Sequence, residues 1–235
     1  MRKRIKSLIF FMVVFSGVAI FFFTQYGIQL LADEETPPKG ETMKLPKPRF
    51  KSPTSVEEAL LGRRSVRDYR KDSLTIDQIS QLLWAAQGIT AKWGGRTAPS
   101  AGALYPLEIY LVSGEVKGLE PGLYHYDSGR HVITLKKKGD LRQEITQASL
   151  YQDEILRAPA ILIITAVYER TEEKYGERSV RYVHMEVGSV GENIYLQAES
   201  LNLGTVFIGA FDDGQVKKVM GIGEEPLGIM PVGKS

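Results

Sequence analysis

The feature that most constrains the fold is a nearly continuous apolar run at residues 160–167, which has the length of one strand. A strand with one exposed face alternates apolar and polar side chains, whereas an unbroken run is typical of a strand covered on both faces. Each covered face must pack against another layer of structure. The run therefore predicts a central strand in a layered fold.

Helix and strand signals elsewhere in the chain predict an α+β fold without internal repeats. Capping boxes that begin at Ser55 and Thr75 predict the starts of two helices, which end at Gly62 and Gly88. Further helices are expected at residues 140–151, 179–201 and 214–220. Further strands are expected at residues 107–113, 122–126, 131–135, 204–211 and 227–232.

Length and composition indicate one globular domain with extensions. The chain has 235 residues, of which 43% are hydrophobic and 25% charged, enough for a domain of about 150 to 200 residues. A net charge of +2 is too small to indicate a nucleic-acid partner. Cysteine is absent from the sequence, which excludes disulfides, thiol catalysis and cysteine-bound metals.

The first 32 residues have the pattern of a membrane-crossing segment. Basic residues at positions 2, 3, 4 and 6 precede an uncharged stretch at 7–32, and acidic residues follow at 33–35. As a helix rising 1.5 Å per residue, this stretch is longer than the roughly 30 Å hydrocarbon core requires. The charges place the start in the cytoplasm and the remainder across the membrane. A cleaved signal peptide is the alternative, although no clear small-x-small cleavage site precedes Asp33.

Residues 33–53 are expected to form a stiff, extended linker. The segment is rich in charge and proline and has few apolar residues. We therefore expect the folded domain to occupy residues 54–235.

Two short segments carry the strongest functional signal. Residues 63–67, Arg-Arg-Ser-Val-Arg, offer guanidinium groups and a hydroxyl that together suit a phosphate. Residues 99–106, Pro-Ser-Ala-Gly-Ala-Leu-Tyr-Pro, have small side chains between two prolines, so their backbone can approach a flat ligand closely. Taken alone, the first segment is equally consistent with a solvated helix end and the second with an ordinary turn. Together they predict a pocket for a phosphorylated planar cofactor.

These two segments, in this order, resemble the flavin-binding signature of the nitroreductase superfamily, and more narrowly that of its SagB-type dehydrogenases, which include thiazole/oxazole-forming oxidases. The likeness continues at residues 174–178, Lys-Tyr-Gly-Glu-Arg, and 203–211, Leu-Gly-Thr-Val-Phe-Ile-Gly-Ala-Phe. It covers the chain from about Ser55 onward. The family's E-x-G-H-x-x-Q-N pattern is changed, because Ser189 and Glu192 stand at its histidine and glutamine positions.

The resemblance implies a mixed sheet flanked by helices, a homodimer, and FMN lodged between the subunits. The residues implied to hold the phosphate end of FMN are Arg63, Arg64, Ser65, Arg67 and Lys234. The residues implied to border the isoalloxazine ring are Pro99, Ser100, Ala101, Gly102, Phe207, Ile208 and Gly209.

The resemblance also implies proton transfer by Lys174 and Tyr175 while hydride moves to or from FMN, with NAD(P)H as a candidate reductant. Without the family pattern, a Lys-Tyr pair before a helix is typical of a solvated loop. Gly188 and Gly191 on the predicted helix at 179–201 would permit close helix packing in a dimer.

Signatures of other enzyme classes do not fit this chain. Residues 221–226 lack the third glycine of a dinucleotide fingerprint and follow a predicted helix. Residues 187–191 lack the first glycine of a nucleophile elbow. His125, His131 and His184 show no metal-ligand spacing, so no metal site is expected.

We therefore expect an FMN-dependent oxidoreductase that is anchored by its N-terminal segment and acts on a small-molecule or peptide substrate. The rival interpretation is a membrane-tethered binding or interaction protein that keeps the fold without turnover. Because bound flavin is yellow, the absorbance of the purified protein separates the two. The sequence does not identify the substrate.

Overall fold

The computed structural model describes residues 40–235, so the predicted anchor at 1–32 lies outside the described residues. The described part forms one unit, Glu41–Ser235. No helix within residues 40–235 combines the length and the apolar character that a bilayer span needs.

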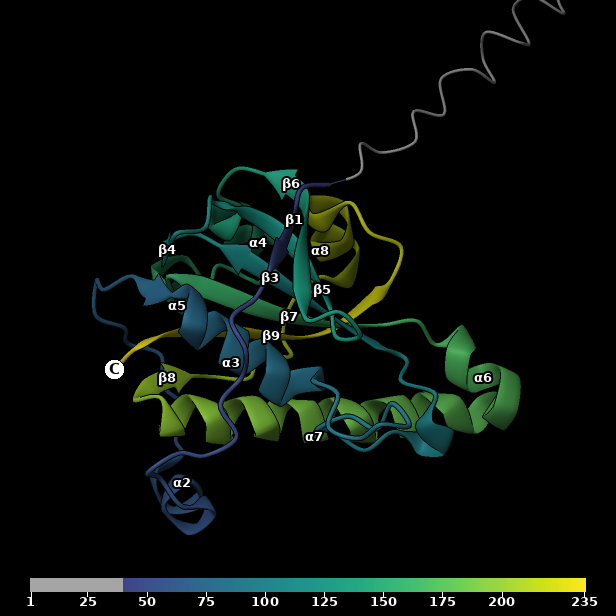
Figure 1. Ribbon diagram of the computed structural model, residues 1–235. Coiled ribbons are helices and arrows are strands. Elements are labelled where there is room, and N and C mark those ends of the chain that lie inside the picture. Colours follow the sequence, from purple (N-terminus) through teal and green to yellow (C-terminus); the bar gives the residue numbers. More distant parts are fainter. Residues whose placement is uncertain (1–39) are drawn as a thin grey trace, which may run out of the picture. The chain divides into compact units, whose positions relative to one another are not determined.

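A seven-stranded sheet with the order β1-β6-β5-β3-β7-β9-β8 forms the middle layer (Figure 1). Its strands are β1 Thr42–Lys44, β3 Leu107–Ser113, β5 Gly122–Asp127, β6 Val132–Lys138, β7 Ala160–Ala166, β8 Leu203–Thr205 and β9 Glu225–Lys234. Neighbouring strands run antiparallel. A parallel bridge between Ser65 and Thr205 at the β8 edge makes the sheet mixed. A separate parallel pair joins β2 Leu74–Thr75 to β4 Val116–Lys117.

Strand β7 confirms the prediction of a central strand. It lies between β3 and β9, and all of its residues are buried. Leu162 and Ile164 face one hydrophobic core, while Ile161 and Ile163 face the other. The unbroken apolar run thus reflects two covered faces.

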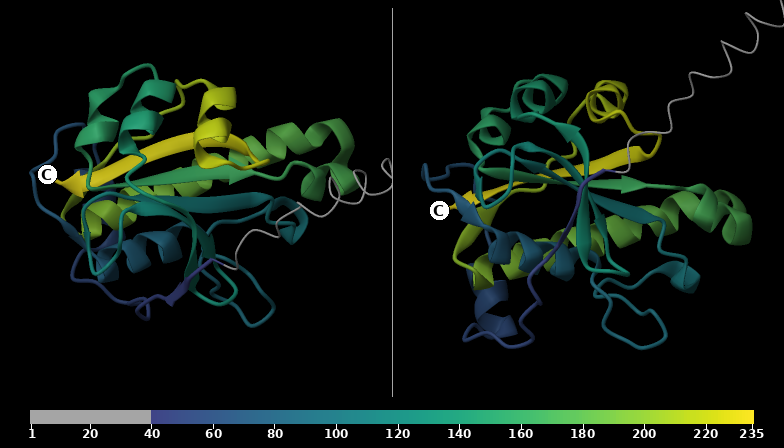
Figure 2. Two further views of the ribbon diagram at one scale, coloured as in Figure 1. Left: turned by 90° about the horizontal axis from the view of Figure 1, so that it is seen from above. Right: turned by 45° about the horizontal axis from the view of Figure 1, so that its top comes forward.

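Helices cover both faces of the sheet (Figure 2). One face packs against α3 Ile76–Gln87 and the long helix α7 Ser179–Ser200. The other packs against α4 Arg142–Ala148, α5 Asp153–Arg157 and α8 Asp213–Met220. The remaining helices are α2 Val56–Gly62, which contacts α7, and α6 Glu169–Tyr175, which precedes it.

Local signals explain where the helices begin and end. Both predicted capping boxes are present, at Ser55 for α2 and at Thr75 for α3, and Gly88 ends α3. The helix predicted at 140–151 is present but ends earlier, at Ala148. Leu150 and Tyr151 adopt positive φ angles of 56° and 58°, which ends α4 and allows a separate α5 to form.

The folded unit begins earlier than the predicted start at residue 54. Residues 42–53, which we call the N-terminal strap, contain β1, whose Met43 pairs with Ile133 of β6. After β1 the strap has no regular pattern, but Ser80 Oγ donates a hydrogen bond to the carbonyl oxygen of Pro46 at 2.6 Å. The Arg49 backbone N–H donates to the side chain of Gln81 at 2.8 Å. Side-chain partners thus hold a proline-rich segment that the sequence alone suggested was a linker.

Candidate functional site

The segment that carries the predicted phosphate contacts, residues 63–70, runs along the edge formed by β8 and β9. The Val66 N–H donates to the carbonyl oxygen of Thr205, and the Arg70 N–H to that of Lys234, both at 2.9 Å. These backbone bonds place the arginine run and Lys234 on the same edge of the sheet. The structure thus brings together both parts of the predicted phosphate site.

The first two arginines of the run point to different partners. The Arg63 guanidinium lies over the ring of Tyr195, 5.1 Å from its centroid. Arg64 instead turns back and donates to the carbonyl oxygens of Leu61 and Arg63, at 3.0 and 2.7 Å. Arg63 is therefore the better placed of the two to meet a ligand beside α7.

The other two predicted cations form weak ion pairs at the surface. Arg67 lies 3.4 Å from Glu154 of α5, and its side chain is 58% exposed. Lys234 lies 3.8 Å from Asp72. Exposed pairs of this kind contribute about 1 kcal/mol or less, so an anionic ligand can displace them.

Tyr195 joins the arginine run to the segment after β8. Its hydroxyl accepts a hydrogen bond from the Phe207 N–H at 2.7 Å and lies 3.1 Å from Ser65 Oγ. With Arg63 over its ring, Tyr195 thus contacts three of the predicted cofactor residues. Tyr195 was not predicted as a site residue, because nothing in the local sequence pattern distinguishes it from other residues of α7.

The strand predicted at 204–211 is wrong beyond Thr205, where β8 ends. The backbone then returns to the sheet only through a bridge between Ile208 and Ile229. The Phe207 ring fills the space left by two glycines, Gly191 of α7 and Gly228 of β9, where added side chains would collide with it. A side chain at Gly209 would meet nothing within 4 Å, so this stretch offers an open surface.

The predicted ring segment, residues 99–106, contacts the predicted proton-transfer pair. A Cβ atom on Gly102 would lie 2.8 Å from the Tyr175 hydroxyl and 3.0 Å from Lys174 Nζ. Lys174 and Tyr175 form the end of α6 rather than a loop. Gly102 has a φ angle of 63°, so a side chain there would be strained as well as crowded.

Within one chain the two predicted halves of the site lie toward opposite ends of α7 (Figure 1). Tyr195 contacts the arginine run, whereas Glu186 lies close enough to Ser100 of the ring segment for that side chain to lower its pKa. At 1.5 Å per residue, Glu186 and Tyr195 are about 14 Å apart along the helix axis. The halves are therefore parts of one extended surface and not walls in direct contact.

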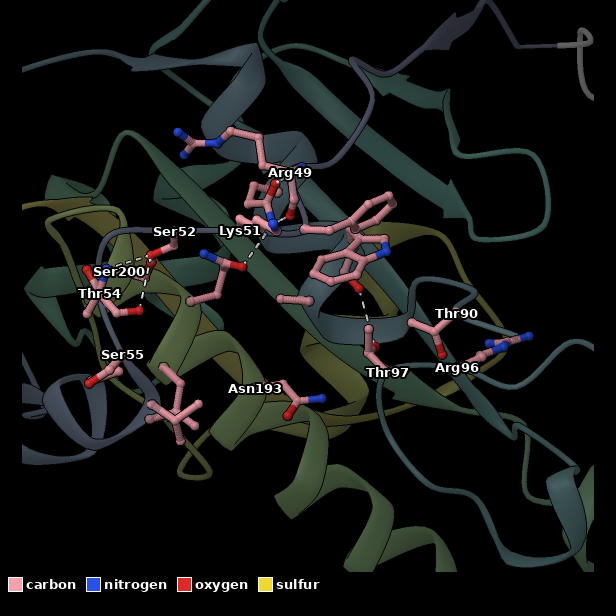
Figure 3. A pocket seen from close by; sticks show the side chains of 18 residues that line it. Arg49, Lys51, Ser52, Thr54, Ser55, Thr90, Arg96, Thr97, Asn193 and Ser200 are labelled. Carbon is pink, nitrogen blue, oxygen red and sulfur yellow. Dashed lines mark hydrogen bonds between the residues drawn. The ribbon is translucent and has the colours of Figure 1, made fainter. Parts of the chain in front are cut away.

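A groove of about 510 Å³ lies on the α3 side of α7, beneath the N-terminal strap (Figure 3). Phe50 and Trp84 form its aromatic wall, with ring centroids 5.5 Å apart. It runs from Arg96 and Thr97 to Ser200, and none of the predicted cofactor residues is among those that line it. The groove has a volume suited to a small ligand but is separate from the predicted flavin contacts.

The histidines serve as hydrogen-bonding groups. Across residues 40–235, no cluster of three or more His, Cys, Asp or Glu side chains has a geometry that suits a metal ion. The histidines bond to neighbouring side chains: His125 to Glu108, His131 to Tyr126 and His184 to Tyr168.

The site residues fit a flavin mononucleotide in their chemistry. Cations and the hydroxyl of Ser65 occupy one sheet edge, an open backbone surface lies at Gly209, and a side-chain-free backbone at Gly102 meets Lys174 and Tyr175. The phosphate of FMN, its planar ring and proton transfer at the ring would each have a suitable group in this chain.

Comparisons with known proteins identify the family of this chain. The nitroreductase family model matches residues 60–234. The nitroreductase candidate MJ1384 of Methanocaldococcus jannaschii is 47% identical over 195 residues, which cover 83% of this chain and 98% of that protein. The microcin B17-processing protein McbC of Escherichia coli is 29% identical over 169 residues, covering 67% of this chain and 60% of McbC.

Solved structures of similar proteins point to the same family. A crystallised nitroreductase candidate of Ralstonia eutropha has a TM-score of 0.74 and 30% identity, covering 84% of this chain and 91% of that one. A chain of the Escherichia coli microcin synthetase McbBCD complex has a TM-score of 0.63 and 26% identity, covering 87% and 82%. From its sequence and fold, the chain belongs to the nitroreductase family and has the fold of its flavin-type oxidoreductases.

Proposed function

We propose that this protein is an FMN-dependent oxidoreductase of the SagB type that transfers hydride to or from a small-molecule or peptide substrate. The observation that carries the proposal is the Tyr195 hydroxyl, which joins Ser65 to the backbone of Phe207 and so links the arginine run to the stretch 207–209 that is expected beneath the ring. Bound FMN would supply the hydride chemistry, and the protein would supply position and electrostatics.

The SagB-type assignment rests on likeness to peptide-processing proteins. McbC is named for processing microcin B17, and TfxB of Rhizobium leguminosarum, 31% identical over 113 residues, for processing trifolitoxin. The matched part is 60% of McbC and 30% of TfxB, so a peptide substrate is one proposal beside a small molecule.

Arg63, Ser65, Arg67 and Lys234 would hold the phosphate and ribityl end, with Arg64 as a weaker contributor because it is bonded to the end of α2. Charge-assisted hydrogen bonds contribute roughly 1.5 to 3 kcal/mol each, more than the exposed ion pairs that they would replace. FAD should bind less well than FMN, because its additional nucleotide needs a site for which the sequence offers no glycine fingerprint.

Pro99, Ser100, Ala101 and Gly102 would border the flavin ring, and Phe207, Ile208 and Gly209 would lie beneath it. Lys174 Nζ and the Tyr175 hydroxyl both meet the backbone at Gly102, so a substrate on the ring would lie within reach of both groups. We assign them the roles of holding and moving the substrate proton.

We also propose a homodimer, because a second chain would bring the ring segment of one copy near the arginine run of the other. The exposed face of α7 supports this, since Gly188 has open space around it and Met185 is 61% exposed. Light scattering of the FMN-loaded protein tests it, and a monodisperse monomer that retains FMN would refute it.

For residues 1–32 we propose an uncleaved membrane anchor with the catalytic domain outside the cytoplasm. Membrane fractionation and N-terminal sequencing of the full chain distinguish an anchor from a cleaved signal peptide. A soluble protein with an intact N-terminus would contradict both.

The experiment for the main proposal is a visible spectrum of the purified full-length chain, before and after addition of FMN. We expect absorbance bands of bound flavin, and chromatography of the released cofactor should identify FMN. A colourless protein that does not take up FMN would overturn the proposal and favour the non-catalytic interaction protein.

A further inference from the structure

Behind the ring segment, five side chains form a closed set of contacts, which we call the Glu186 network. Its members are Gln87 of α3, Arg96, Ser100, Tyr105 and Glu186 of α7. Arg96 Nη1 donates to Gln87 Oε1 at 3.0 Å, and Gln87 Nε2 donates to Glu186 Oε1 at 3.3 Å. The side chain of Ser100 lies close enough to Glu186 to lower its pKa, and Ser100 Oγ accepts a hydrogen bond from the Tyr105 N–H at 2.9 Å.

Tyr105 and Arg96 close the network. The Arg96 N–H donates to the Tyr105 hydroxyl at 3.2 Å, and the Arg96 guanidinium lies 4.4 Å from the centroid of the Tyr105 ring. The two ends of residues 96–105 are thus tied to each other, and Arg96 ties them to α3 and, through Gln87, to Glu186 of α7.

Glu186 is an unusual residue for its position. It is 3% exposed and lies on the apolar face of α7 with Val183, Val187 and Val190. Within residues 40–235 it has no cationic side chain at ion-pair distance, since Arg96 reaches it only through Gln87. Burial raises the pKa of Glu186, against the opposing effects of Ser100, Gln87 and Arg96. Burying a carboxyl group costs free energy unless hydrogen bonds compensate it, and an apolar side chain at this position would avoid that cost. The presence of Glu186 among valines therefore indicates a role for its hydrogen bond to Gln87.

The segment that Glu186 contacts is strained. Gly102, Ala103 and Tyr105 have φ angles of 63°, 54° and 47°, and non-glycine residues adopt such angles at a cost of about 1 to 3 kcal/mol each. Backbone of this kind persists only where its surroundings fix it. Ser100 precedes the strained residues and Tyr105 ends them, so the Glu186 network holds both sides.

We propose that Glu186 is a positioning residue for the cofactor-facing segment. Through Gln87 and Arg96, which reaches Tyr105, and through its neighbour Ser100 it fixes the backbone of residues 100–105. It thereby holds Gly102 against Lys174 and Tyr175. The expected effect of Glu186 on flavin affinity rests on the proposed FMN function. The expected effect of Glu186 on the backbone of residues 100–105 is independent of that function.

The test compares Glu186→Gln and Glu186→Ala in the full-length chain, with Glu192→Ala as the matched control, since Glu192 is an exposed glutamate on the same helix. Glutamine keeps the size and the hydrogen-bonding capacity of the side chain, and alanine removes both. The first measurement is amide hydrogen exchange at Tyr105, whose N–H donates to Ser100 Oγ.

We expect the Tyr105 amide to exchange roughly tenfold to hundredfold faster in Glu186→Ala, the equivalent of losing a hydrogen bond to a buried group. Exchange should stay close to wild type in Glu186→Gln and Glu192→Ala. Unchanged exchange in Glu186→Ala would overturn the proposal, and so would equal losses in the alanine and glutamine variants.

The second measurement is FMN affinity, from quenching of flavin fluorescence. Glu186→Ala should weaken it roughly tenfold or more, and Glu186→Gln should restore it. If the wild type binds no FMN, the proposed function fails, while the exchange result still decides the positioning role.

If Glu186→Ala does not fold, Glu186→Met takes its place, since methionine fills the core position but cannot make the hydrogen bonds of the carboxyl group. Tyr105 exchange should rise in this variant as well. Exchange at the wild-type rate in a folded Glu186→Met variant would overturn the proposal.

Discussion

The hydroxyl of Tyr195 accepts a hydrogen bond from the backbone N–H of Phe207 at 2.7 Å and lies 3.1 Å from Ser65 Oγ. One side chain of α7 thus holds two chain segments that are distant in the sequence. Replacing Tyr195 by phenylalanine would leave the Phe207 N–H without its partner.

We expect Tyr195→Phe to reduce the free energy of unfolding by about 1 to 3 kcal/mol, because a part-buried donor loses its acceptor. FMN affinity should fall as well, since Ser65 and Phe207 both border the proposed site. Urea unfolding and flavin titration measure the two effects. Tyr151→Phe is the control, because Tyr151 is 73% exposed, and wild-type values for both variants would contradict the role of Tyr195.

The double variant Arg63→Ala, Arg67→Ala should lose FMN, since two charge-assisted phosphate contacts contribute roughly 1.5 to 3 kcal/mol each. Flavin retained after gel filtration measures this. Arg130→Ala is a suitable control, because Arg130 pairs with Asp127 at the surface in the β5–β6 turn. If the double variant retained as much FMN as the wild type, Arg63 and Arg67 would not bind the phosphate.

Lys174→Ala and Tyr175→Phe should each slow turnover of the physiological substrate by roughly 10² to 10⁴ fold, the usual contribution of a positioned acid or base. Flavin binding should survive, because the phosphate contacts lie on another element. Stopped-flow reduction or oxidation of the bound flavin by that substrate measures the rate, with exposed Lys71→Ala as the control. Normal turnover of that substrate in both variants would mean that the pair is only a solvated helix end.

Stability should depend on pH through Glu186. Because burial raises its pKa, the folded protein binds this proton more tightly than the unfolded chain does. The contribution of protonated Glu186 to the free energy of unfolding is therefore fully present below its ordinary pKa of 4.5, and it is lost as the pH rises through the pKa of the folded state. Glu186→Gln should become more stable relative to wild type as pH increases from about 4.5 to 8. Urea unfolding across this range measures the difference, and a difference that stays constant or falls with pH would show that Glu186 does not titrate in this way.

The N-terminal strap should be needed for stability. A chain that begins at Thr54 loses β1, buried Leu45 and the Pro46 carbonyl that accepts from Ser80, whereas a chain that begins at Glu41 keeps them. We expect the shorter chain to unfold at a clearly lower temperature, because loss of a buried leucine alone costs about 2 to 5 kcal/mol. Equal melting temperatures in calorimetry would show that the strap is a free linker after all.

The sequence predicted the elements that carry periodic or local signals. The run at 160–167 and the capping residues Ser55 and Thr75 each depend on nearby positions, and all are confirmed within a residue or two. The strap was missed because its partners, such as Ser80 and Gln81, lie on a helix far along the chain. No local pattern reports such bonds.

In the candidate site too, local motifs were predicted and contacts between distant segments were not. The segments at 63–67 and 99–106 were visible as motifs, but their links to α7 through Tyr195 and Glu186 were not. A signal for Glu186 was nevertheless present, since a carboxyl interrupts the apolar stripe of Val183, Val187 and Val190. Its partners Gln87 and Ser100 come from two other segments, so only the three-dimensional structure identifies what it holds.

The place of β9 in the sheet bears on when this domain can fold in the cell. Strand β9 follows every other described strand in the chain, yet it lies inside the sheet, between β7 and β8. Ribosomes add about 5 to 20 residues per second, so β7 waits several seconds for this neighbour. The sheet is therefore completed only after Glu225–Lys234 has been synthesised. Any process that acts on the N-terminus during synthesis acts while the sheet still lacks β9.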